Sequence, residues 1–156
     1  FLHVSHVSSP YSVTLTGAWG GVHSATDFEK TNRFPWFTNT LLGGYFDHHD
    51  ADGTIGTVRV DSAFAAHPVM RGVPTNWNTQ DEWYYMNRDV SVQPGFQIIS
   101  RLASDNRPVV WLKELGSDKN GRMFYTTRGH NKSVYKEPDF KKLILNGILW
   151  ATHRLD

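Results

Sequence analysis

The spacing of hydrophobic residues predicts several strands followed by one clear helix. Apolar side chains recur at helical spacing over residues 140–151, and Pro138 stands where the first turn would lie. Residues 54–60 alternate between apolar and polar side chains, which indicates a strand with one buried face. Residues 96–102 are predicted as a second strand because they are mainly apolar.

The region between this strand and the helix predicts a hairpin. Residues 108–113 and 122–127 read as strands, and the Asn120-Gly121 pair between them is a strong turn signal. The further predicted elements are a short strand at 18–22, a short helix at 34–42, a turn at 67–72 and a strand at 82–86.

Composition fits one domain with a packed core. The chain has 156 residues, of which 39% are hydrophobic and 13% aromatic. Its 16 basic and 15 acidic residues are interspersed and give a net charge of +1, so we expect neither a nucleic-acid partner nor a membrane-surface partner. The mean hydropathy is -0.46 and no long apolar run is present, which excludes a transmembrane helix.

The absence of cysteine removes several kinds of chemistry. The chain can form no disulfide, no thiolate metal site and no cysteine nucleophile. Residues 1–16 have neither a basic start nor an apolar core of the length that a signal peptide needs. The chain also begins with Phe1 rather than Met, so the cytoplasmic and the periplasmic or secreted compartments both stay open.

The histidines give the strongest indication of a functional site. Four of the eight lie at the ends of predicted strands, namely His23, His48, His49 and His130. In open α/β sheets the crevice at the carboxyl ends of the strands is where ligands bind. Imidazole transfers protons near neutral pH and is a common metal ligand, so the pattern predicts a histidine-lined site of either kind.

Two of these histidines follow glycines that permit sharp turns. His23 comes after Gly20 and Gly21, in a tight strand-to-helix turn similar to a nucleophile elbow. His130 follows Gly129 at the end of another strand, and we expect the two imidazoles at the same sheet edge if these strands are neighbours. The alternative for His23 is a buried residue that caps the next segment.

Carboxylates accompany the histidines. Asp81 and Glu82 precede a run of aromatic residues, where a carboxylate can orient an imidazole or act as a base; a strand-end charge is the alternative. The polar run at residues 47–52 is not a calcium loop, because Gly53 at the sixth position would make His48 the first ligand and no Glu closes the loop. We expect one of His48 and His49 to face the site, and the rest of the run to be solvated.

Two further residue types have competing interpretations. Trp36 belongs to a set of aromatic residues that could stack on sugar rings, although most of that set is expected in the core. His67 precedes Pro68, and we expect it to be an exposed or locally hydrogen-bonded turn residue.

Taken together, the motifs resemble those of the ThuA-like (trehalose-utilisation) family, in order from about residue 17 to residue 151. The matching stretches are Gly20-Gly21-Val22-His23-Ser24-Ala25-Thr26-Asp27, Phe34-Pro35-Trp36-Phe37, Leu42-Gly43-Gly44-Tyr45-Phe46, His67-Pro68-Val69-Met70-Arg71-Gly72-Val73-Pro74, Asp81-Glu82-Trp83-Tyr84, Pro108-Val109-Val110-Trp111, Gly121-Arg122-Met123-Phe124-Tyr125-Thr126-Thr127, Gly129-His130 and Gly147-Ile148-Leu149-Trp150-Ala151. That these motifs occur together and in register makes the resemblance specific.

The resemblance implies a flavodoxin-like three-layer α/β sandwich related to class I glutamine amidotransferases. Those relatives carry a cysteine at the elbow where this chain has His23, so glutamine hydrolysis through a thioester is excluded. The family is associated with the catabolism of trehalose and related disaccharides through keto-sugars. The resemblance thus implies a small-molecule sugar substrate and a keto-sugar isomerase, lyase or hydrolase.

The roles expected within that site follow from the chemistry of its residues. His23, His130 and Glu82 are the expected catalytic residues, and His23 and His130 are the alternative ligands of a Zn²⁺ ion. The substrate-binding residues are expected to be His48, His49, Asp27, Trp36 and Asp81.

Residues 1–16 depart from the family pattern. Family members have several strands and helices before the Gly-Gly-x-His strand, and residues 1–16 do not look like that region. We therefore expect an atypical segment at 1–16 and an incomplete ThuA-like domain, truncated at its N-terminal side, at 17–156. Two other functions stay open: a non-catalytic carbohydrate-binding or accessory module, and an inactive fragment that pairs its free edge in a homo-oligomer.

Overall fold

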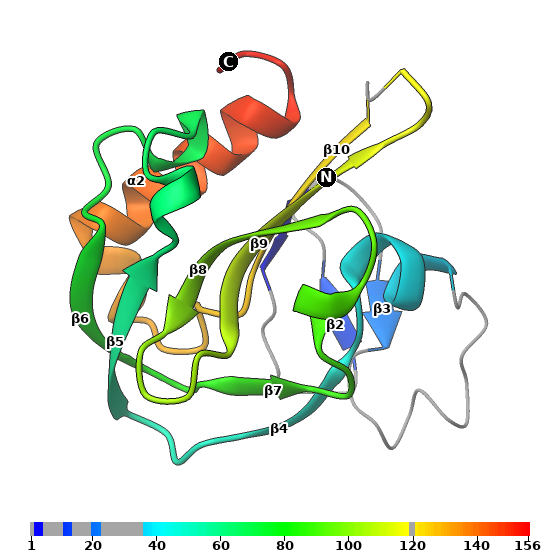
Figure 1. The fold of residues 1–156 in the computed structure, drawn as a ribbon. Helices are drawn as coiled ribbons and strands as arrows, with labels where there is room; N and C mark the ends of the chain where they lie inside the picture. The colour runs from blue at the N-terminus through cyan, green and yellow to red at the C-terminus, as the bar shows by residue number, and fades with distance from the viewer. Residues whose placement is uncertain (1, 5–10, 14–19, 23–35, 119–120) are drawn as a thin grey trace.

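The computed structural model describes residues 2–4, 11–13, 20–22, 36–118 and 121–156. Its centre is a six-stranded sheet with the strand order β1-β10-β9-β8-β5-β6 (Figure 1). The strands are β1 (Leu2–Val4), β5 (Thr54–Val60), β6 (Asn76–Asp81), β8 (Phe96–Leu102), β9 (Pro108–Leu115) and β10 (Gly121–Thr126). The β1–β10 pair is parallel, and the other neighbouring pairs are antiparallel.

Smaller elements surround this sheet. Two short antiparallel pairs join β2 (Tyr11–Val13) to β3 (Gly20–Val22) and β4 (Phe46–His49) to β7 (Tyr84–Met86). The helices are the π-helix η1 (Trp36–Leu42), the 3-10 helices η2 (Ser62–Phe64), η3 (Pro68–Met70), η4 (Val90–Val92) and η5 (Val134–Lys136), and the α-helix α2 (Pro138–Ala151). Within the described residues, no helix has the length and apolar character needed to span a membrane.

The sheet is buried on both faces. Along β9, Val110 and Leu112 point into the core that also contains Leu143 and Trp150 of α2. Trp111 points to the opposite face, into a second cluster with Leu42 of η1. The indole Nε1 of Trp111 donates to the Leu42 carbonyl at 2.9 Å, which fixes η1 against the sheet.

Helix α2 forms as the hydrophobic spacing predicts. Phe140, Leu143 and Trp150 are buried along one face of the helix. Asn146 lies on the buried side as well, and its Nδ2 donates to the carbonyls of Val69 and Arg71 at 3.0 and 2.9 Å. The helix therefore holds the loop at the end of η3 through hydrogen bonds as well as apolar packing.

The predicted strands at 54–60 and 96–102 are confirmed as β5 and β8. The hairpin is confirmed by the β9–β10 register, which pairs Gly121 with Leu115. The predicted helix at 34–42 is a π-helix within the described residues, and the predicted strand at 82–86 is limited to β7. The sequence analysis missed β6, whose buried positions hold the polar residues Thr79 and Asp81.

The curl of the sheet creates the site. Four antiparallel pairings separate β6 from β10, so the two strands run in the same direction and end at the same edge. The chain after β10 reaches across to β6, where the Gly129 amide donates to Asp81 Oδ2 at 2.8 Å. Residues at the carboxyl ends of two distant strands are thereby brought into contact.

Candidate functional site

The candidate site is centred on Glu82, which lies between two imidazoles. Its Oε1 is 3.6 Å from His49 Nε2, and its Oε2 is 3.2 Å from His130 Nδ1. The Glu82 side chain is only 8% exposed, whereas those of His49 and His130 are 38% and 24% exposed. We call these three residues the Glu82 cluster. Its carboxylate is buried, and its imidazoles open to solvent.

Asp81 fixes the backbone that carries Glu82 and His130. This residue is fully buried, and its Oδ2 accepts the Gly129 amide at 2.8 Å. Its Oδ1 accepts the amides of Asn131 and Glu82 at 3.1 and 3.0 Å. These bonds fix the backbone on both sides of His130 and at Glu82 itself. The structure thus gives Asp81, expected to bind substrate, a positioning role for the two neighbouring side chains.

The hydrogen bond of His49 defines its tautomer. Its Nδ1 lies 2.6 Å from the carbonyl oxygen of Asp50. Because a carbonyl oxygen only accepts hydrogen bonds, Nδ1 must carry the proton. In the neutral ring Nε2 then bears a lone pair, and this atom is the one that faces Glu82.

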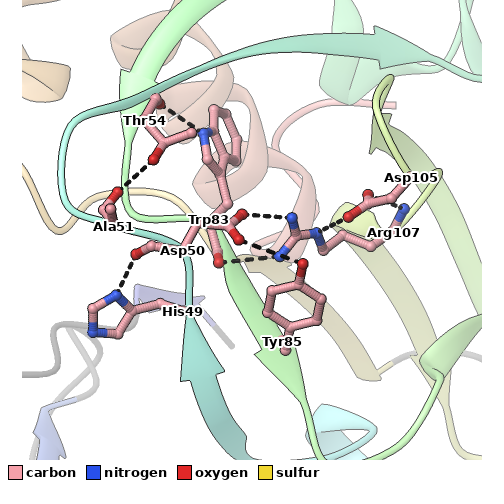
Figure 2. Close-up of polar contacts among 8 residues, drawn as sticks. All are labelled: His49, Asp50, Ala51, Thr54, Trp83, Tyr85, Asp105 and Arg107. Carbon is pink, nitrogen blue, oxygen red and sulfur yellow. Dashed lines mark hydrogen bonds and ion pairs between the residues drawn. The ribbon is translucent and has the colours of Figure 1, made fainter.

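An arginine fixes the loop that carries His49. Arg107 Nη2 pairs with Asp50 Oδ2 at 2.5 Å, and Nη1 donates to the Trp83 carbonyl at 3.2 Å (Figure 2). Its Nε pairs with Asp105 Oδ2 at 2.7 Å, and the guanidinium lies 3.6 Å from the centre of the Tyr85 ring. The guanidinium therefore ties the chain after β4 to the chain after β6, so that His49 and Glu82 keep a fixed relation.

Asp52 joins the cluster, which the sequence analysis did not expect. Its Oδ1 accepts a hydrogen bond from Asn131 Nδ2 at 2.8 Å. One ligand atom each from Asp52, Glu82 and His130 lies within 4.8 Å of the others, a grouping that could hold a metal ion. Asp52 was expected to lie in a solvated loop. No local sequence pattern predicts its contact with Asn131, because that contact depends on how the chain after β10 folds.

Tyr84 adds a neutral donor beside the carboxylate. It is almost completely buried. Burial raises the pKa of the Tyr84 phenol, and the negative charge of the neighbouring Glu82 raises it further. The phenol therefore stays protonated at physiological pH.

Of the adjacent histidines His48 and His49, the structure brings only His49 to Glu82. His48 is exposed, stacks on Tyr85 with 4.2 Å between ring centres, and pairs with Asp47 at 2.8 Å. Successive side chains of a strand point to opposite sides, so His48 and His49 diverge. His49 is the histidine of this pair that lies beside Glu82, and the expectation that one of the two faces a substrate site stays a prediction.

The other expected site residues lie elsewhere or outside the described part of the chain. Trp36 begins η1 and is 49% exposed. His23 and Asp27 lie outside the described residues. His67 is a locally hydrogen-bonded turn residue, as expected, because its Nδ1 accepts the Val69 amide at 3.2 Å at the start of η3.

Comparisons with known proteins identify similar chains. The family model of ThuA, described as trehalose utilisation, matches residues 12–151. A ThuA-like protein from Bacteroides uniformis superposes with a TM-score of 0.63 at 23% identity, over 78% of this chain and 53% of that one. A ThuA-like protein from Parabacteroides merdae gives a TM-score of 0.52 at 23% identity, over 69% of this chain and 42% of that one.

These matches define the extent of the likeness. The chain spans about half the length of the two solved structures. Curated protein sequences gave no match. The structural likeness concerns the strand-rich fold with its curled sheet and C-terminal helix.

Proposed function

Because the chain belongs to the ThuA trehalose-utilisation family, we propose that it acts on a sugar or keto-sugar through the Glu82 cluster. The observation that carries the proposal is a buried carboxylate flanked by two partly exposed imidazoles, 3.6 and 3.2 Å away. This arrangement suits proton transfer, since the imidazoles can meet a substrate while the carboxylate stabilises an imidazolium. The protein is therefore proposed to be an enzyme with a small-molecule sugar substrate.

The chemistry that we propose is proton abstraction next to a carbonyl group. A keto-sugar has acidic C–H bonds beside its carbonyl. One imidazole takes the proton, the C–H electron pair forms a C=C bond, and the carbonyl oxygen becomes an enolate oxygen. Isomerisation follows when the proton returns to the former carbonyl carbon while the proton of the neighbouring hydroxyl passes to the former carbonyl oxygen. Loss of a leaving group gives elimination instead. Asp81 and Arg107 act only by holding the two imidazoles and Glu82 in place.

We also propose the flavodoxin-like sandwich as the fold of the whole domain, with residues 17–156 as its later part. The support is coverage, since 78% of this chain corresponds to only 53% of the Bacteroides uniformis protein. The role of His23 at the elbow stays a prediction, since this residue lies outside the described residues. The activity is therefore proposed for the protein in its natural length.

The test is turnover of a 3-keto-disaccharide by His130→Gln and Glu82→Gln variants, with the matched control His153→Asn. We expect each cluster variant to lose about 10²- to 10⁴-fold in kcat, the usual contribution of a general acid or base. His153 is exposed and adopts a positive φ of 57°, which Asn tolerates, so the control should keep full activity. Unchanged turnover in both cluster variants would overturn the proposal.

A non-catalytic carbohydrate-binding module is the second candidate. The observation that favours it is a groove lined by an aromatic ring and several polar side chains, among them Tyr85, Arg88, Asp105 and Asn106. Aromatic faces with adjacent hydrogen-bonding groups are suited to sugar rings. This function predicts saturable sugar binding without product, with little effect of His130→Gln.

A further inference from the structure

Three possible metal ligands lie close together around Glu82. One ligand atom each from Asp52, Glu82 and His130 lies within 4.8 Å of the others. The Nε2 of His49 lies 3.6 Å from Glu82 Oε1 and is outside this grouping of three. The three residues come from separate segments: the loop before β5, the end of β6 and the loop after β10.

Two of these atoms are acceptors that face each other. His49 Nδ1 donates to the Asp50 carbonyl, which leaves only a lone pair on Nε2 in the neutral ring. Glu82 Oε1 is likewise an acceptor. Two acceptors at this separation repel unless a positive charge lies beside them.

The charge balance favours a cation over a proton. Asp52, Asp81 and Glu82 lie together, and among the described residues no lysine or arginine forms an ion pair with any of them. The nearby guanidiniums have other partners, because Arg107 pairs with Asp50 and Asp105 and Arg128 pairs with Glu137. A buried carboxylate without a compensating charge is costly, and a divalent ion supplies that charge directly.

We propose that Asp52, Glu82 and His130 bind one divalent transition-metal ion of the Zn²⁺ type. Imidazole ligands favour Zn²⁺ over Mg²⁺ and Ca²⁺, which prefer sets made only of oxygen ligands. An outer partner orients one of the ligands, since Asn131 Nδ2 donates to Asp52 Oδ1 at 2.8 Å. His23, a metal ligand expected from the sequence, lies outside the described residues.

The role of the ion rests on the proposed function, although its ligand set does not. A metal ion at this place would polarise a carbonyl or hydroxyl oxygen of the sugar. Such polarisation makes the neighbouring C–H bond more acidic, so the ion would assist the proposed proton abstraction. Nε2 of His49, which lies outside the ligand set, would then be the base, because the ion would occupy the lone pair of His130.

The test is isothermal titration of EDTA-treated full chain with ZnCl₂. We expect one ion per chain, with binding weakened at least about tenfold by Asp52→Asn and by His130→Gln. The controls Asp47→Asn and His153→Asn likewise replace one aspartate and one histidine by an amide residue, at exposed positions outside the cluster, and should bind as the unmodified protein does. Thermal unfolding of each EDTA-treated variant checks its fold. If His130→Gln fails to fold, Asp52→Asn decides, because Asp52 lies in an exposed loop.

Two outcomes would overturn the metal site: no saturable binding, or equal affinity in the cluster variants and their controls. The result is independent of turnover. Full activity in EDTA with no bound metal would remove the ion and leave the proposed function standing. Stoichiometric Zn²⁺ without turnover of any keto-sugar would leave the ion and remove the proposed function.

Discussion

Asp81 is the single residue on which the geometry of the Glu82 cluster most depends. Its buried carboxylate accepts three backbone amides, from Glu82, Gly129 and Asn131. Buried hydrogen bonds to a charged acceptor are strong, and a donor that loses its partner keeps the whole cost of desolvation. The residue therefore links the end of β6 to the chain after β10.

The Asp81→Asn variant should lower the free energy of unfolding by about 2–4 kcal/mol. The amide nitrogen of Asn would replace one carboxylate oxygen and point a donor at backbone N–H groups. Urea unfolding at pH 7 measures the change. Asp47→Asn is the control, since Asp47 is exposed, and should shift stability by no more than about 0.5 kcal/mol. An equally small effect of Asp81→Asn would contradict the positioning role.

His67 gives a prediction about pH. Burial lowers the pKa of His67, the positive charge of Arg122 lowers it further, and Glu114 opposes the shift. Its neutral Nδ1 accepts the Val69 amide, which the imidazolium would be unable to do. The unfolded chain therefore binds the proton more readily than the folded chain. This contribution to stability is complete above the unfolded pKa of about 6.5 and is lost as pH falls through the lowered folded pKa.

The measurement is thermal unfolding between pH 7.5 and 5. His67→Asn keeps an acceptor for the Val69 amide but removes the titrating group. This variant should lose less stability than the unmodified protein over that range. A pH profile identical to that of the unmodified protein would show that His67 plays no part.

The site could be predicted in part from single residues. Gly129-His130 and Asp81-Glu82 stood out because a glycine turn or an acidic pair next to a strand end is visible locally. Asp52 and Asn131 were missed because their contact joins two loops 79 positions apart in the sequence. Arg107 was missed for a similar reason, since its partner Asp50 lies 57 positions away.

At the level of elements, periodicity identified those with one apolar face. β5 and α2 were predicted because their apolar residues recur at strand and helix spacing. β6 was not predicted, because its buried positions hold Thr79 and Asp81 rather than apolar side chains. The chain after β10 lies against that polar face. The polar residues that made β6 hard to predict therefore also help to form the site.

Helix α2 offers a test of its packing at Gly147. A Cβ added there would lie 2.7 Å from ring carbons of Phe124, which is fully buried. Replacement of a helical Gly by Ala normally gains about 1 kcal/mol of propensity. Overpacking costs about 1–3 kcal/mol, so the clash should outweigh that gain.

We therefore expect Gly147→Ala to destabilise the protein, by up to about 2 kcal/mol in urea unfolding. Lys141→Ala on the exposed side of the same helix is the control and should be neutral to within about 0.5 kcal/mol. A stabilised Gly147→Ala variant would mean that α2 lies farther from β10 than the structure places it.

At the scale of the whole molecule, the curl of the sheet brings the parts of the site together. β6 and β10 stand four pairings apart, yet the buried guanidinium of Arg128 donates to Thr79 on β6 and to Glu137, at 2.9 Å, just before α2. Arg128 also lies over Phe140, with 4.9 Å to the ring centre. These contacts of Arg128 join β6 to the start of α2, near the Glu82 cluster.

The β9–β10 hairpin was predicted from its turn, but the antiparallel pairing of β5 with β6 and β8, and of β8 with β9, could not be predicted from the sequence. Strand patterns give which side chains are buried, but the order and direction of strands depend on contacts made across the whole chain. The sequence motifs indicated the ThuA family, and the family model that matches residues 12–151 confirms this prediction.

The most direct test of the central claim, proton abstraction by the Glu82 cluster, is hydrogen exchange in the substrate. A 3-keto-disaccharide is incubated with the protein in D₂O, and NMR follows deuterium entering at the carbons next to the carbonyl. The account predicts exchange well above the buffer rate for the unmodified protein and the His153→Asn control, and a return toward the buffer rate for His130→Gln and Glu82→Gln. Exchange at the buffer rate with the unmodified protein, or undiminished exchange in both cluster variants, would contradict it.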